Sequence, residues 1–155
     1  MSNVFPRQIT NPPIKAVSSD GCYIIDENGK QYLDGSGGAA VSCLGHGDPD
    51  VIKAVQDQTS KMAFAHTGFF SSDPAEELAE LLIDNAPGEL DRVYFVSGGS
   101  EAIEAAIKLA RQFHIENGEP SRHHIIARKQ SYHGNTLGAL AAGGNKWRRN
   151  QFEPI

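Results

Sequence analysis

The chain has 155 residues, of which 39% are hydrophobic and 21% are charged, and its formal net charge is −5. This composition fits a soluble globular protein of one ordinary domain size. The acidic balance argues against a surface that binds nucleic acid.

Cysteine and histidine content argues against disulfide and metal chemistry. Two cysteines, Cys22 and Cys43, form neither a disulfide framework nor a zinc quartet. The histidines lie far apart in the sequence or side by side, without cysteine or carboxylate at zinc-ligand spacing.

No apolar run approaches membrane-spanning length, and residues 1–17 lack the apolar stretch of a signal peptide. We therefore expect a cytoplasmic protein with no metal site and no membrane contact.

The first half of the chain predicts an arm, a hairpin and two helices. Residues 1–19 are polar and rich in proline, which indicates an extended arm. Asn28-Gly29 separates two strand-like runs, 22–26 and 31–34, and predicts a hairpin with a type I′ turn. Helices are expected from Pro49, with Asp48 as N-cap, and from Asp73-Pro74 as far as Pro87-Gly88.

The second half predicts alternating strands and helices. An apolar strand at 93–96 leads into a helix over 100–117. The buried face of this helix would carry Ile103, Ala106, Ala110 and Phe113. Another strand is expected at 124–128. This alternation predicts an α/β fold with a parallel sheet, whose ligands bind at the carboxyl ends of the strands. Two loops, 97–100 and 131–134, follow the predicted strands at such ends.

The turn Ser97-Gly98-Gly99-Ser100 predicts an anion site. A strand that feeds a glycine turn and then a helix offers unpaired backbone N–H groups, and the helix dipole adds partial positive charge. Ser100 adds a hydroxyl donor. Neither the P-loop pattern nor the dinucleotide pattern GxGxxG is present, so a small phosphorylated cofactor is favoured over a nucleotide. From the turn alone, glycines needed only to connect a strand to a helix remain an equal alternative.

Four motifs give the chain a family resemblance. They are DGSGGAAVSCLGH at 34–46, the Pro, Ala-Val and Gln of 49–58, FVSGGSEAIEAAIKLAR at 95–111 and SYHGNTLG at 131–138. Over about residues 21–155 the chain resembles the class III pyridoxal-phosphate-dependent aminotransferases of fold type I. The resemblance implies that residues 1–48, arm and hairpin, contribute to the small domain. Residues 49–155 would form the first, incomplete part of the pyridoxal-phosphate-binding large domain, with a mostly parallel sheet and flanking helices.

The resemblance also implies the cofactor, pyridoxal 5′-phosphate, and four residues that bind it. Gly99 and Ser100 would hold its phosphate, Tyr132 would lie against its ring, and His133 would lie beside it. A half-buried tyrosine in a turn and a structural histidine are the alternatives for the last two. The chain departs from the family in carrying Ser97-Gly98 where Asn-Ser or Thr-Ser is usual, which changes the number of donors around the phosphate.

The implied activity is transfer of an amino group from an amine or ω-amino acid to a 2-oxo acid, in a homodimer. Decarboxylating and amino-shifting relatives share the phosphate motif. No catalytic residue is predicted within the chain, because the family places its Schiff-base lysine after Tyr-His-Gly and no lysine here matches that position. We therefore expect the amino-terminal portion of an aminotransferase. The alternative is a non-catalytic fragment that needs a second chain for activity.

Overall fold

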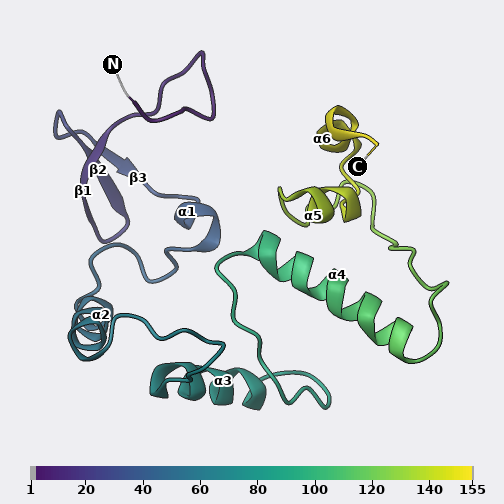
Figure 1. The fold of residues 1–155 in the computed structure, drawn as a ribbon. Helices are drawn as coiled ribbons and strands as arrows, with labels where there is room; N and C mark the ends of the chain where they lie inside the picture. Colours follow the sequence, from purple (N-terminus) through teal and green to yellow (C-terminus); the bar gives the residue numbers. More distant parts are fainter. Residues whose placement is uncertain (1–2, 155) are drawn as a thin grey trace. The chain divides into compact units, whose positions relative to one another are not determined.

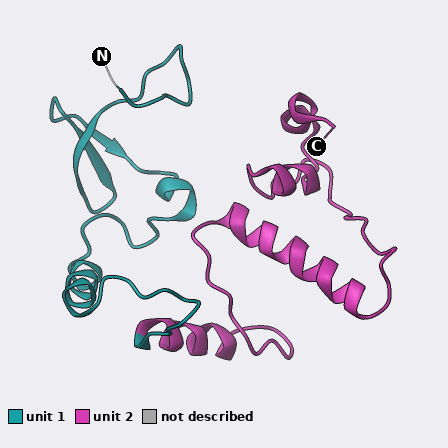
Figure 2. Ribbon diagram, viewed as in Figure 1, with its two compact units in different colours: residues 1–73 teal, residues 74–155 magenta. Residues whose placement is uncertain are grey.

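A computed structural model describes residues 3–154, so that Met1, Ser2 and Ile155, the outermost residues of the two predicted domains, lie outside the described part. Figure 2 shows two compact units, residues 1–73 and 74–155. In chain order the elements are β1 (Ala16–Asp20), β2 (Tyr23–Asp26), β3 (Gln31–Leu33), α1 (Gly37–Ala40), α2 (Pro49–Lys61), α3 (Asp73–Asp84), α4 (Gly99–Glu116), α5 (Leu137–Ala142), α6 (Lys146–Arg149) and the 3₁₀ helix Asn150–Phe152 (Figure 1). The domain division predicted at 48/49 stays a prediction about the complete fold.

The first unit contains an antiparallel sheet in the order β1-β2-β3. The predicted hairpin is present, with Ile24 opposite Tyr32. A type I′ turn requires a positive φ at both central residues. The predicted turn is not of this type, because Gly29 has a φ of 79° whereas Asn28 has no positive φ. The Asp26 carboxylate accepts hydrogen bonds from the N–H of Asn28 (2.8 Å) and of Lys30 (2.9 Å), and so closes a longer loop. Residues 16–20, of which 16–19 were predicted to lie in the arm, form β1 because the hairpin offers them an edge to pair with.

A second carboxylate organises the segment after β3. Asp34 accepts hydrogen bonds from Ser42 Oγ (3.1 Å) and His46 Nε2 (3.0 Å), and its side chain is 9% exposed. Weaker contacts at 3.3 Å come from Ser36 Oγ and the Gly38 N–H. These donors, with His46 first, lower the pKa of Asp34 below its usual range.

The turn closed by Asp34 is left-handed. Gly37, Gly38, Ala39 and Ala40 have φ between 55° and 66°, a region that costs an alanine roughly 1–2 kcal/mol. His46 also exchanges two backbone hydrogen bonds with Gly21, of 3.0 and 2.6 Å, which ties the end of this segment to the sheet. The Asp34 contacts therefore hold a strained turn between two fixed ends.

The helix starts of this half follow the sequence closely. The Asp48 carboxylate caps α2 by accepting from the N–H of Asp50 and of Val51, both at 3.0 Å, and Pro49 is the first helical residue. Helix α3 begins at Asp73 as predicted. Both helix starts are thus confirmed.

The second unit contains helices and extended segments. Neither 93–96 nor 124–128 forms a strand, so both strand predictions are wrong for the described residues. Their composition is that of strands, but they join no ladder, and a strand exists only when a neighbour pairs with it. The described residues therefore confirm the helices of the α/β fold, while their only sheet is small and antiparallel.

Helix α4 contacts α5 through a carboxylate. Glu104 Oε1 accepts from the N–H of Ala139 (3.1 Å), near the amino-terminal end of α5. The Thr136 hydroxyl, the Ala139 N–H and the Gly138 N–H together lower the pKa of Glu104. The first N–H groups of a helix lack intrahelical acceptors, and Thr136, the N-cap residue of α5, makes no side-chain hydrogen bond to them. Glu104 of α4 supplies an acceptor for these N–H groups instead.

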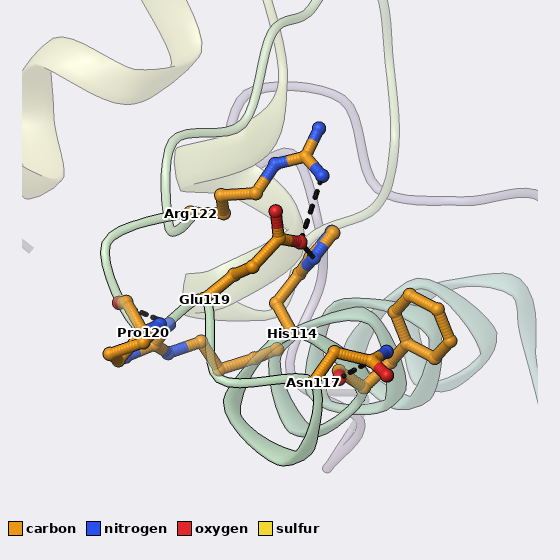
Figure 3. Close-up of polar contacts among 7 residues, drawn as sticks. His114, Asn117, Glu119, Pro120 and Arg122 are labelled. Carbon is orange, nitrogen blue, oxygen red and sulfur yellow. Dashed lines mark hydrogen bonds and ion pairs between the residues drawn. The ribbon is translucent and has the colours of Figure 1, made fainter.

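The carboxyl-terminal end of α4 is also closed by side chains (Figure 3). Glu119 Oε2 accepts from Arg122 at 3.0 Å and lies 3.2 Å from His114 Nδ1, while Asn117 Nδ2 donates to the Phe113 carbonyl at 3.0 Å. Gly118 has a φ of 74°, as expected for the residue that follows a helix. The predicted end of this helix is confirmed.

Few side chains are buried in the described residues. Ala139 is the one buried hydrophobic side chain among them, and Asp26 is buried in the sheet. On α4 the predicted buried face is covered only in part: Ile103 is half-buried, as are Glu104 and Ala105, whereas Ala110 is exposed and Phe113 is 59% exposed. The apolar faces of α2 and α3 are exposed as well, for example at Val55 and Leu81.

We predict that Asp34 makes stability depend on pH in the acid range. Since its folded pKa lies below the ordinary value near 3.8, its contribution is present above that value and is lost as pH falls through the lowered folded pKa. Thermal unfolding of the natural polypeptide that carries these residues, followed between pH 2 and 6, should show a steeper acid loss than the Asp34→Asn variant. Equal pH profiles for the two proteins would contradict the assignment.

Gly134→Ala should destabilise the second unit. Gly134 has a φ of 141°, and a Cβ there would lie 2.6 Å from Ser100 Oγ and 2.9 Å from Ser100 Cα. We expect the free energy of unfolding in urea to fall by about 1–3 kcal/mol, as for other overpacked sites. Gly35→Ala is the matched control, because Gly35 has open space around it and no positive φ. A similar loss in both variants would show that the close approach to Ser100 does not matter.

Candidate functional site

The predicted anion site lies at the amino-terminal end of α4. The first helical hydrogen bond runs from the Ala102 N–H to the Gly98 carbonyl (3.0 Å), so the N–H groups of Gly99, Ser100 and Glu101 have no intrahelical acceptor. Glu101 Oε2 accepts a hydrogen bond from the Ser97 N–H at 3.0 Å, so the Glu101 carboxylate lies beside the preceding loop. The helix end therefore offers donors to an anion.

The backbone angles show what the two glycines do. Gly98 has φ −170° and ψ 165°, an extended conformation open to any residue, and Gly99 is helical. A Cβ at either position would meet nothing within 4 Å. Glycine is therefore not required here by the backbone conformation, and the Cβ positions of both residues are open.

The second predicted loop, 131–134, contacts the first. Ser100 Oγ donates to Asn135 Oδ1 and accepts from the Asn135 N–H, both at 3.0 Å. Gly134 is buried and lies so close to Ser100 that no side chain fits between them. The structure thus brings Ser100 and the Tyr-His-Gly loop together, across a separation of about 35 residues.

Tyr132 and His133 precede this contact. The Tyr132 ring is 61% exposed, and the Arg148 guanidinium lies 5.3 Å from its centroid, a cation–π contact. His133 is half-buried and lines a small cavity with Gly134, Asn145 and neighbouring residues. Tyr132 is therefore largely exposed but has the Arg148 guanidinium over its ring, while His133 contributes to the packing of the loop.

Sequence reasoning singled out Gly99, Ser100, Tyr132 and His133 but assigned no role to Asn135 or Arg148. Both lie beside the predicted residues in the structure. The position of Asn135, directly after the Tyr-His-Gly motif, was the available signal for the first. Arg148 follows a glycine-rich segment, and no sequence pattern connects it to Tyr132.

Residues 3–154 hold neither a cluster of metal ligands nor a helix that could span a membrane. No three His, Cys, Asp or Glu side chains there gather closely enough to hold a metal ion. No helix within these residues is long and apolar enough to cross a membrane.

Comparisons with known proteins place the chain in a family. The family model for class III aminotransferases matches residues 4–155. An uncharacterized aminotransferase of Schizosaccharomyces pombe is 46% identical over 92% of this chain and 31% of its own length. An acetylornithine aminotransferase of Clostridium acetobutylicum is 37% identical over 88% of this chain and 34% of its own. The chain therefore spans about a third of the length of these relatives.

Solved structures agree. An (S)-enantioselective omega-transaminase from Thermomicrobium roseum superposes with a TM-score of 0.90 and 36% identity, over 99% of this chain and 36% of that one. The omega transaminase of Pseudomonas jessenii, solved in complex with PMP, gives a TM-score of 0.91 at 28% identity, over 99% of this chain and 35% of that one. On these matches in sequence and fold, the chain belongs to the class III aminotransferases, pyridoxal-phosphate enzymes of fold type I.

Proposed function

We propose that the natural polypeptide carrying this chain transfers an amino group from an amine or ω-amino acid to a 2-oxo acid. The observation that supports this most is the meeting of the α4 N-terminus with the Tyr-His-Gly loop at Ser100, in a chain of the aminotransferase family. The omega-transaminases among its structural neighbours support amino transfer over decarboxylation or an amino shift.

The residues present fit pyridoxal phosphate. The N–H groups of Gly99 and Ser100 have no intrahelical acceptor and suit a phosphate, and the positive end of the helix dipole favours a dianion there. The exposed ring of Tyr132 offers a flat surface for a pyridine ring. When bound, the cofactor supplies an electron sink for the amino-group chemistry.

Each residue of the site has a separate task in this proposal. The N–H groups of Gly99 and Ser100, with the Ser100 hydroxyl, bind and orient the phosphate. Tyr132 holds the ring, and the Arg148 guanidinium on its face adds positive charge to the surroundings. His133 supports the loop beside the cofactor. Glu104 keeps its charge directed at α5 and away from the phosphate, because it accepts hydrogen bonds there.

A homodimer in the cytoplasm, with a mostly parallel sheet in its complete large domain, completes this proposal. A second candidate concerns the 155 residues taken alone: a non-catalytic fragment that needs a second chain. The exposed apolar faces of its helices and the share of about a third of its relatives' length favour that candidate for an isolated chain. Sizing the natural polypeptide by mass spectrometry and light scattering distinguishes the two.

Ser100→Ala should weaken cofactor binding. The change removes one charge-assisted hydrogen bond of about 1.5–3 kcal/mol, so affinity should fall roughly ten- to a hundredfold. The backbone donors remain, and binding should not vanish. Tyr132→Ala should also weaken binding and shift the absorbance of the cofactor. Titration with pyridoxal phosphate is the measurement, with Ser60→Ala as control because Ser60 bonds only the preceding helical turn of α2. Unchanged affinity in Ser100→Ala would show that the glycine turn only connects two segments of the chain and does not bind the phosphate.

The reaction itself is tested with the natural polypeptide. We expect amino transfer from at least one amine or ω-amino acid to pyruvate or 2-oxoglutarate, detected as the new amino acid by chromatography. Release of CO₂ or an isomerised product, with no transfer from any donor, would contradict the transaminase proposal and favour its decarboxylating or amino-shifting relatives.

A further inference from the structure

The Ser100 hydroxyl is fully engaged with one residue. Its proton is donated to Asn135 Oδ1, and its oxygen accepts the Asn135 N–H, each at 3.0 Å. A hydroxyl has a single proton to donate. Any anion that needs this proton must therefore take it from the Asn135 side chain.

The two bonds differ in how easily they can be exchanged. The Asn135 N–H belongs to a backbone that is fixed by the buried Gly134 on one side and by the contact of Glu104 with α5 on the other. The Asn135 side chain is exposed and can rotate. A phosphate dianion is a stronger acceptor than a neutral amide oxygen, so it can displace Oδ1 while the backbone N–H keeps Ser100 Oγ in place.

We propose that Asn135 is a positioning residue of the phosphate site, whose side-chain carbonyl occupies the place of an anion oxygen and competes with it for the Ser100 proton. The proposal rests on the phosphate site proposed above. In this role Asn135 orients the hydroxyl through its backbone and limits anion affinity through its side chain.

The side chain at position 135 then determines whether a substitution raises or lowers the affinity for an anion. Asn135→Ala removes the competing acceptor and leaves the backbone N–H in place, so an anion should bind more tightly. Asn135→Asp replaces a neutral acceptor by a carboxylate, which accepts the Ser100 proton more strongly and is itself favoured by the helix N-terminus. The negative charge of this carboxylate should also repel a phosphate at the same site. A residue that only supported the loop would weaken binding in both variants.

The test is a titration of the natural polypeptide with pyridoxal phosphate, followed by absorbance, and with inorganic phosphate, followed by protection against thermal unfolding. We expect Asn135→Ala to bind both ligands roughly two- to tenfold more tightly, the range of one neutral hydrogen bond. Asn135→Asp should bind both about tenfold or more weakly. Without ligand, Asn135→Ala should unfold at a lower temperature than the parent, although it binds more tightly.

Two controls isolate the Ser100 contact. Asn117→Ala removes a comparable side-chain hydrogen bond at the far end of α4 and should leave both affinities unchanged. In the Ser100→Ala background, Asn135→Ala should no longer tighten binding, because no hydroxyl proton is left to compete for.

The outcomes separate this inference from the cofactor proposal. If phosphate affinity follows the order Ala, Asn, Asp while pyridoxal phosphate does not bind, the inference stands and the cofactor proposal falls. If the parent binds pyridoxal phosphate but Asn135→Ala weakens binding as Asn135→Asp does, the cofactor proposal stands and the inference is overturned. Binding of neither ligand by any variant overturns both.

Discussion

The contact between the Glu104 carboxylate and the N–H groups that begin α5 holds the candidate site together. It joins two helices that are separated by a long segment without regular secondary structure, and it fixes the loop that runs from Tyr132 to Thr136. Through that loop it fixes Asn135 against Ser100, on the turn of α4 that lies one turn before Glu104. A single acidic side chain thus aligns both predicted loops, while its own charge is compensated by the N–H groups it binds.

Capping patterns are the part of this fold that the sequence predicts best. Asp48-Pro49, Asp73-Pro74 and Gly118 act through neighbours in the chain, so their effect does not depend on distant residues. The hairpin was predicted for the same reason. Its turn type was not, because the Asp26 carboxylate binds the loop from outside the Asn-Gly pair.

Features that depend on a distant partner were predicted poorly. Residues 93–96 and 124–128 have the composition of strands, yet a strand requires a ladder. By contrast β1, in which three of five residues are polar, formed because a ladder was available. At the site, Gly99, Ser100 and the Tyr-His-Gly loop were found through motifs. The Ser100–Asn135 pair was not, since nothing in either local pattern indicates which residue meets the other across the unit.

The left-handed turn over Gly37–Ala40 has a consequence for the unfolded chain. Ala39 and Ala40 keep exposed methyl groups at φ of 65° and 66°, where glycine would fit without strain. Each methyl also narrows the conformations open to the unfolded chain, which is worth about 0.4–1 kcal/mol of entropy. The native strain of roughly 1–2 kcal/mol per alanine exceeds that gain. The turn is therefore kept by its hydrogen bonds, those to Asp34 among them, and the intrinsic preference of its two alanines opposes it.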